Sequence, residues 1–119
     1  MMEYENEVIF CIVNEGFSDT VMDAARRAGA KGGTVMRAHG LANAEAEKMF
    51  GITVSPQKEI IMMLVDHGSR DAILHALYSA IGLDTPGQGI AFSLPVDGVA
   101  GLPGVTPGAD EKSPEENGK

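Results

Sequence analysis

Residues 8–13, Val-Ile-Phe-Cys-Ile-Val, and residues 60–65, Ile-Ile-Met-Met-Leu-Val, are the two continuous apolar runs that decide the fold of this 119-residue chain. Their length and their content of β-branched residues predict strands that are buried on both faces. A polar break, a stretch with helical spacing and a second strand-like run follow each of them. The sequence therefore predicts a strand–helix–strand unit that occurs twice.

The first unit continues through a helix into an alternating strand. After the break at residues 14–16, we expect Ser18 to cap the helix. Apolar residues then recur at helical spacing, and Gly29 ends the helix. Residues 34–39 alternate between apolar and polar side chains, which is typical of an edge or half-exposed strand.

The second unit repeats this order with a more apolar helix. Residues 66–68 break the strand, and Ser69 is the expected helix cap. An apolar stripe at helical spacing follows, and Gly82 ends the helix. Residues 90–94 form the last predicted strand, which we expect Pro95 to end.

The order βαββαβ with right-handed crossovers predicts an α+β fold, the ferredoxin-like sandwich. It has an antiparallel four-stranded sheet with two helices on one face. The more apolar runs, 8–13 and 60–65, should be the central strands, and 34–39 and 90–94 the edges. Since the helices cover only one face, apolar central strands predict that the other face is buried by self-association.

Two segments lie outside this repeat. Residues 41–57 form a 17-residue connection, longer than the about two to five residues of a plain hairpin. Long loops are often functional, so this loop either docks a partner or folds back onto its own oligomer. The chain length suits one domain, predicted over residues 1–103, and the Gly- and Pro-rich acidic tail 104–119 is expected to be disordered.

The charge and the apolar runs limit the class of protein. The formal net charge is -8, and no clustered basic face suggests a nucleic-acid partner. No apolar run approaches the ~18 residues of a membrane span. The polar, acidic residues 1–7 do not resemble a secretory signal, so we expect a cytoplasmic protein. Cys11 is the single cysteine and is predicted to be a buried small hydrophobe.

The polar residues predict no catalytic set and no metal site. His39, His67 and His75 lack the spacing of metal ligands. No nucleophile motif surrounds Ser18, Ser55, Ser69, Ser79 or Ser93. The chain is therefore not expected to be an enzyme. A trimeric metal-binding module of the divalent-cation-tolerance type and a ferredoxin-like enzyme remain as alternative hypotheses.

Two phrases in the chain resemble the PII nitrogen-regulatory signalling proteins. Gly32-Gly33-Thr34-Val35 begins the second strand, where that family has Gly-x-Thr-Val. Residues 87–96, Gly-Gln-Gly-Ile-Ala-Phe-Ser-Leu-Pro-Val, are similar to the family phrase Gly-Asp-Gly-Lys-Ile-Phe-Val-x-Pro-Val. Gly40 lies where the long loop leaves the second strand. The resemblance extends over about residues 8–101.

The resemblance implies a homotrimer that binds ATP or ADP in clefts between subunits. It also implies that loop 41–57 docks onto a regulated enzyme or a membrane transporter in nitrogen or related metabolism. The residues that would line the nucleotide site by this resemblance are Thr34, Gly40, Leu64, Gly87, Gln88 and Gly89.

Three departures from the family concern the phosphates. Ile90 stands where the family has a phosphate-binding lysine, and Gly101 and Pro103 stand where it has two arginines. Because cations normally hold a triphosphate, these changes argue against ATP. They favour a less charged adenine nucleotide or another small anion, with Lys31, Arg37 or Lys58 as replacement cations. The loop also has no tyrosine that could be uridylylated.

Overall fold

The computed structural model describes residues 5–41 and 56–101. The elements are β1 (Asn6–Asn14), α1 (Ser18–Arg27), β2 (Thr34–His39), β3 (Gln57–Asp66), the 3-10 turn η1 (His67–Ser69), α3 (Arg70–Ile81) and β4 (Ile90–Val96). The predicted βαββαβ order is confirmed. Most of the long connection, residues 42–55, and the predicted tail 104–119 lie outside the described residues.

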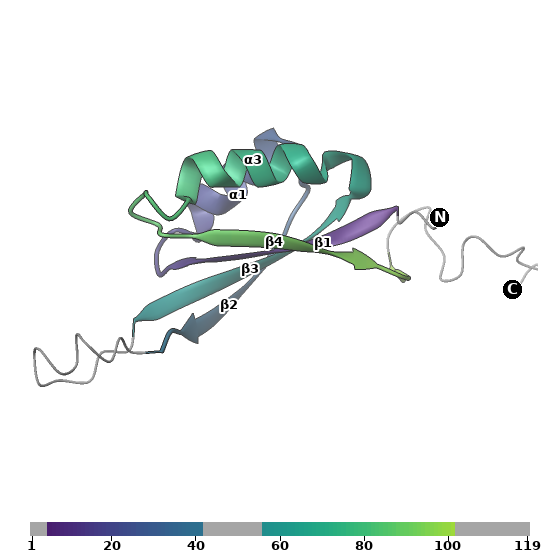
Figure 1. Ribbon diagram of the computed structural model, residues 1–119. Coiled ribbons are helices and arrows are strands. Elements are labelled where there is room, and N and C mark those ends of the chain that lie inside the picture. The colour runs from purple at the N-terminus through teal and green to yellow at the C-terminus, as the bar shows by residue number, and fades with distance from the viewer. Residues whose placement is uncertain (1–4, 42–55, 102–119) are drawn as a thin grey trace, which may run out of the picture.

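The four strands form one antiparallel sheet in the order β2-β3-β1-β4. The apolar strands β1 and β3 are central, and β2 and β4 are the edges, as their composition predicts. Figure 1 shows both helices on the same side of the sheet, α1 and α3 lying next to each other across it. The predicted ferredoxin-like α+β fold is confirmed.

The hydrophobic core lies between the sheet and the helices. Alternate residues of β1 and β3 point into it, among them Ile9 and Ile61, and meet Ile73 and Leu77 of α3. Burying one such side chain contributes about 1.5–3 kcal/mol to folding. The prediction for Cys11 is confirmed, since it is fully buried, and burial raises the pKa of its thiol to about 12.

The predicted cap of α1 is wrong. The helix begins at Ser18 itself, and no side chain next to it in sequence makes a cap hydrogen bond. Instead the backbone N–H groups of Gly16 and Ser18 donate to Oε1 of Glu59, over 3.3 and 3.2 Å. Glu59 is a buried residue of β3, and its negative charge suits the positive end of the helix dipole. A long-range carboxylate therefore does what the local serine was expected to do.

The other two boundary predictions are partly corrected. Ser69 does occupy the N-cap position of α3, but its side chain makes no cap hydrogen bond, and η1 precedes the helix. Pro95 does not end the last strand, because β4 runs to Val96 with Pro95 opposite Glu7. An edge strand tolerates proline, since a missing N–H on its outer side breaks no ladder hydrogen bond.

Candidate functional site

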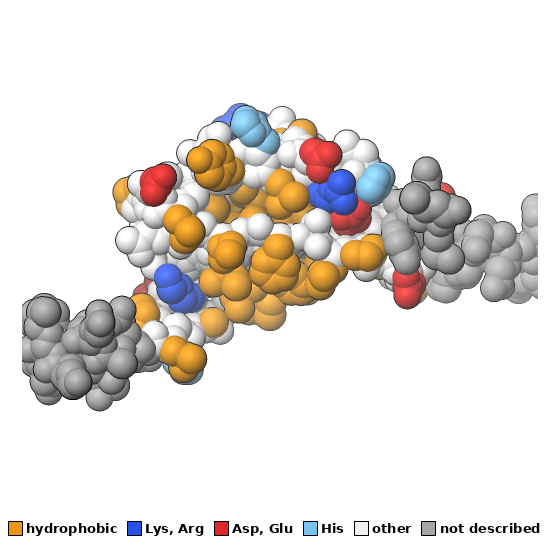
Figure 2. Space-filling model, viewed as in Figure 1, with side chains coloured by type: hydrophobic (Ala, Val, Ile, Leu, Met, Phe, Trp, Pro, Cys, Tyr) orange, Lys and Arg blue, Asp and Glu red, His pale blue; other side chains and the backbone are white. Residues whose placement is uncertain are grey.

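The face of the sheet away from the helices is apolar, and we call it the open face. Figure 2 shows hydrophobic side chains gathered along β4 and below it, on the side opposite the helices. Phe10 and Phe92 stack on this face with ring centroids 5.6 Å apart. The strand register places eleven large apolar side chains here, all partly or well exposed: Val8, Phe10, Ile12, Met36, Ile60, Met62, Leu64, Ile90, Phe92, Leu94 and Val96.

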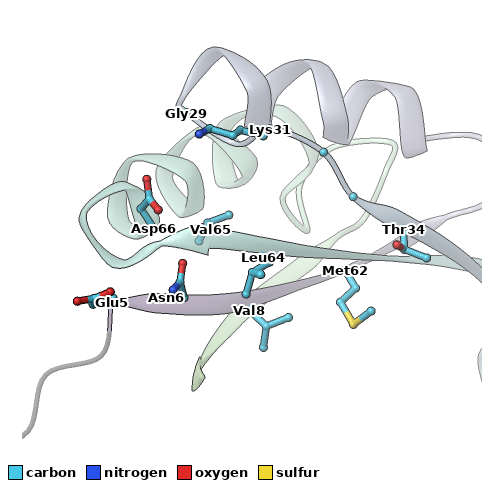
Figure 3. Close-up of a pocket in the computed structure, with 12 residues that line it drawn as sticks. Glu5, Asn6, Val8, Gly29, Lys31, Thr34, Met62, Leu64, Val65 and Asp66 are labelled. Atoms are coloured by element: carbon cyan, nitrogen blue, oxygen red, sulfur yellow. The ribbon is translucent and has the colours of Figure 1, made fainter. Parts of the chain in front are cut away.

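A cavity of about 770 Å³ lies at one end of the sheet, and we call it the strand-end pocket. It is formed where the segment before β2 diverges from the end of β3, and it unites Thr34 with Leu64 (Figure 3). Apolar side chains make one part of the wall. Polar side chains make the rest of it: Glu5, Asn6, Lys31 and Asp66. Two of the six predicted site residues therefore share one cavity.

The turn at residues 87–89 lies at the opposite end of the sheet, next to the last residue of β1. The Asn14 backbone N–H donates to the Gly87 carbonyl oxygen over 2.9 Å. Its side-chain Nδ2 donates to the Pro86 carbonyl oxygen, also over 2.9 Å. Lys58 Nζ in turn donates to Asn14 Oδ1 over 2.8 Å. Asn14 therefore links the turn to the cation of β3.

Two of the three backbone N–H groups of this turn are already hydrogen-bonded within the chain. The Gln88 N–H donates to the Thr85 carbonyl oxygen over 3.0 Å, and the Gly89 N–H to the Ile81 carbonyl oxygen over 2.5 Å. A Cβ at Gly89 would lie 2.5 Å from Ile81 Cδ1 and 2.8 Å from Val13 Cγ1. Packing therefore requires glycine at position 89, whatever else the turn does. Gln88 has a φ of 47°, a backbone conformation that non-glycine residues seldom adopt.

Gly40 belongs to the same end of the sheet as this turn. Its N–H donates to the Pro56 carbonyl oxygen over 2.7 Å, closing the base of the long loop. A Cβ at Gly40 would lie 3.7 Å from Lys58 Cε. Gly40, Lys58, Asn14 and the turn at 87–89 therefore form one group, which we call the turn site.

The six predicted residues thus divide between two ends of one sheet. Thr34 and Leu64 line the strand-end pocket, and Gly40, Gly87, Gln88 and Gly89 belong to the turn site. Within one chain the two groups do not meet. Sequence reasoning missed Asn14, because a single asparagine at the end of a strand carries no motif and its contacts with Lys58, Pro86 and Gly87 are all long-range.

A second buried carboxylate, Glu7, was also missed by sequence reasoning. It accepts hydrogen bonds from His67 Nδ1 and from Arg70 Nη1, the latter over 3.0 and 3.2 Å. Burial raises the pKa of Glu7, but the hydrogen bonds from His67, Arg70 and Ser93 and the Arg70 charge outweigh it and leave the pKa lowered. Since Ser93 and His67 both bond to the carboxylate, their order is not that of a Ser–His–acid triad. The cluster anchors the start of α3 to β1.

Over residues 5–41 and 56–101, no group of three or more His, Cys, Asp and Glu side chains could hold a metal ion. None of the helices described there is long and apolar enough to cross a membrane.

Comparisons with known proteins agree with this geometry at the level of fold. No family model matches the sequence, and no curated protein matches it. Among solved structures, Arabidopsis thaliana PII bound to citrate superposes with a TM-score of 0.63 and 18% identity, over 91% of this chain and 90% of that one. A GlnK–ATP complex of B. subtilis gives a TM-score of 0.64 and 12% identity, over 86% and 92% of the two chains.

A second B. subtilis GlnK structure gives a TM-score of 0.65 at 12% identity and covers 89% of this chain and 97% of that one. The structural likeness thus extends over nearly the whole of both proteins in each comparison. The likeness predicted from the residues at 32–35 and 87–96 is therefore found again in three dimensions: the chain has the fold of the PII and GlnK proteins.

Proposed function

We propose that the chain is a divergent PII-like regulatory protein, a homotrimer that binds a small effector between its subunits. One observation carries the proposal. On a fold shared with a GlnK–ATP complex, the residues matching the PII phrases lie at two ends of a sheet whose open face is apolar. The two groups do not meet within one chain, and assembly of copies would join the ends of different sheets.

The open face supports the homo-oligomer. Eleven large apolar side chains on one face exceed what a monomer usually leaves in water. On this apolar face Phe92 and Leu94 are 43% and 48% exposed. A closed assembly of identical chains buries such a surface, and the PII resemblance favours three copies.

The strand-end pocket supports a small effector. Its volume lies within the range of about 300–1,000 Å³ that is usual for small-molecule sites. Leu64 and Met62 offer an apolar surface for a flat base, and the Thr34 hydroxyl can hydrogen-bond to it. The structures of similar fold hold ATP in B. subtilis GlnK and citrate in Arabidopsis thaliana PII. An adenine nucleotide is therefore the effector that we propose.

The proposed role is regulation rather than catalysis. The bound effector would control an enzyme or a membrane transporter in nitrogen or related metabolism, with loop 41–57 as the docking segment, in the cytoplasm. A docking loop suits this position because it leaves the sheet at Gly40 and returns at Pro56, beside Lys58 of the turn site.

Light scattering and calorimetric titration test the proposal together. The protein should scatter as a trimer and release or absorb heat with at least one of ATP, ADP, AMP and 2-oxoglutarate. Leu64→Ala should weaken binding of the adenine ligand by about tenfold, since it removes apolar contact with the base. Leu94→Ala, at an exposed leucine of the same open face but outside the pocket, is the matched control. A monomer, or no heat with any nucleotide, would contradict the proposal.

A further inference from the structure

The cations near the turn site differ in how much charge they leave for a ligand. Arg37 Nη1 forms an ion pair with Glu15 Oε2 over 2.7 Å. Lys58 Nζ bonds to Asn14 Oδ1, a neutral oxygen, and makes no ion pair with any described residue. Ile90 directly follows the turn. In the described part of the chain the turn site therefore offers one cation whose charge is not already neutralised.

Backbone donors do not make up for the missing charge. The N–H groups of Gln88 and Gly89 donate to carbonyl oxygens of Thr85 and Ile81. A phosphate that replaced those acceptors would break the hydrogen bonds that the turn makes to Thr85 and to Ile81, the last residue of α3. The turn therefore has little capacity to bind several phosphate oxygens through its main chain.

The strand-end pocket is even less suited to phosphates. Among the described residues that line it, Lys31 is the one cation, and Glu5 and Asp66 are carboxylates. Figure 3 shows Lys31 and Asp66 toward the end of the cavity away from Thr34. With two carboxylates and one ammonium, the wall carries a formal charge of -1 from these three residues. A polyphosphate would be repelled here, while hydroxyl and amine donors would find acceptors.

These contacts lead to an inference that rests on the proposed function. We propose that the effector site between subunits selects its ligand by the number of phosphates that the ligand carries. It takes a nucleoside monophosphate in preference to the diphosphate and the triphosphate. A phosphate monoester carries a charge of about −1.5 to −2 near neutral pH, which one lysine can largely offset. Every further phosphate adds negative charge for which the described residues hold no free cation. Lys58 is the residue that pairs with the single phosphate.

Titration calorimetry of the full chain tests this selection with adenosine, AMP, ADP and ATP, at fixed ionic strength and without magnesium, which would neutralise phosphates. AMP should bind about tenfold or more tightly than ATP. Lys58→Gln should weaken the binding of AMP by about tenfold and leave the affinity for adenosine unchanged, because only the phosphate contact is removed. Arg37→Gln, which removes a cation already paired with Glu15, is the control and should change AMP affinity little.

A substitution that adds charge gives the converse test. Gln88→Lys places a cation in the turn itself, at an exposed residue that is not part of the open face, and should narrow or reverse the preference for AMP over ATP, whereas Gln88→Met should not. ATP binding tighter than AMP in the unmodified protein would overturn the inference and leave the proposed function standing. If Lys58→Gln lowered the affinities for adenosine and AMP equally, that result would also overturn the inference. If no adenine ligand binds, both the inference and the nucleotide part of the proposed function fail.

Discussion

The two faces of the sheet are built from adjacent residues of the same strands, yet they differ in what covers them. In β1, Ile9, Cys11 and Val13 are fully buried under the helices, while Phe10 and Ile12 point to the open face and are only partly buried. Both sets are apolar. A continuous apolar strand therefore indicates two separate interfaces, one within the chain and one that only another chain can complete.

The strongest test of this difference between the two faces places one charge on each of them, at neighbouring positions. Ile61→Asp puts a carboxylate into a fully buried site and should abolish folding, because an unpaired buried charge costs far more than the chain's marginal stability. Met62→Asp puts it on the open face, where the side chain is 36% exposed. That variant should fold as a monomer.

Circular dichroism and light scattering separate the two results. The Met62→Asp variant should keep its helix and strand signals while its mass falls to that of one chain. A trimer of Met62→Asp, or loss of fold in that variant alone, would show that the open face is not the assembly surface. Met62→Gln is the matched control, because it keeps the size of the side chain without the charge.

A milder change measures how much each face contributes. Ile9→Ala leaves a cavity in the core and should lower the free energy of unfolding by about 2–5 kcal/mol at any protein concentration. Phe10→Ala removes a stacked ring of the open face, and its cost should appear mainly as weaker assembly. Denaturant unfolding at several protein concentrations distinguishes them. A concentration-independent loss for Phe10→Ala would contradict the assignment of its face.

The sequence predicts the pattern of strands and helices well because that pattern follows from local periodicity. The alternation of apolar and polar residues predicts the observed bounds of β2. The conformational freedom of glycine predicts that α3 ends at Gly82, as it does. The contacts of Glu59 and Asn14 were not predictable in this way. Each depends on residues about 40 to 70 positions away, and no local pattern announces which strand end will meet which turn.

The site was predictable only in part, for a related reason. The resemblance to PII phrases selects six residues, and the fold places them in two groups at opposite ends of the sheet. Thr34 and Leu64 share a cavity because β2 and β3 pair there, with Thr34 opposite Met62. The glycine at position 89 has a packing reason that its motif does not reveal, since Ile81 and Val13 leave no room for a Cβ.

A buried polar group on the helix side gives a prediction about pH. Hydrogen bonds hold the pKa of Glu7 below its ordinary value of 4.5. A lowered carboxyl pKa adds stability that is present above the unfolded-state value and lost as the pH falls through the folded-state value. Acid should therefore destabilise the native protein below about pH 4.5, and Glu7→Gln should remove this part of the pH dependence.

Urea unfolding between neutral pH and pH 3 measures the effect, with Glu5→Gln as the control at an exposed neighbour. At neutral pH, Glu7→Gln should already be less stable than the native chain, since Arg70 and His67 lose their charged acceptor. Equal slopes of stability against pH for the native chain and Glu7→Gln would rule out a stabilising role for the carboxylate.

The smallest expected effect is on the rate at which a cysteine thiol is alkylated, which depends on its burial and changes the stability of the protein little. Burial raises the pKa of Cys11 to about 12, so the thiol stays protonated and unreactive near neutral pH. An alkylating reagent should not label Cys11 in the folded protein at any protein concentration. In the double variant Cys11→Ala, Ile12→Cys, the thiol moves by one residue to the open face. Labelling at position 12 should then be slow in the assembled protein and should accelerate on dilution, as copies dissociate. Fast labelling of Cys11, or a labelling rate at position 12 that does not depend on concentration, would remove the distinction between an interface closed by the helices and one closed by other chains.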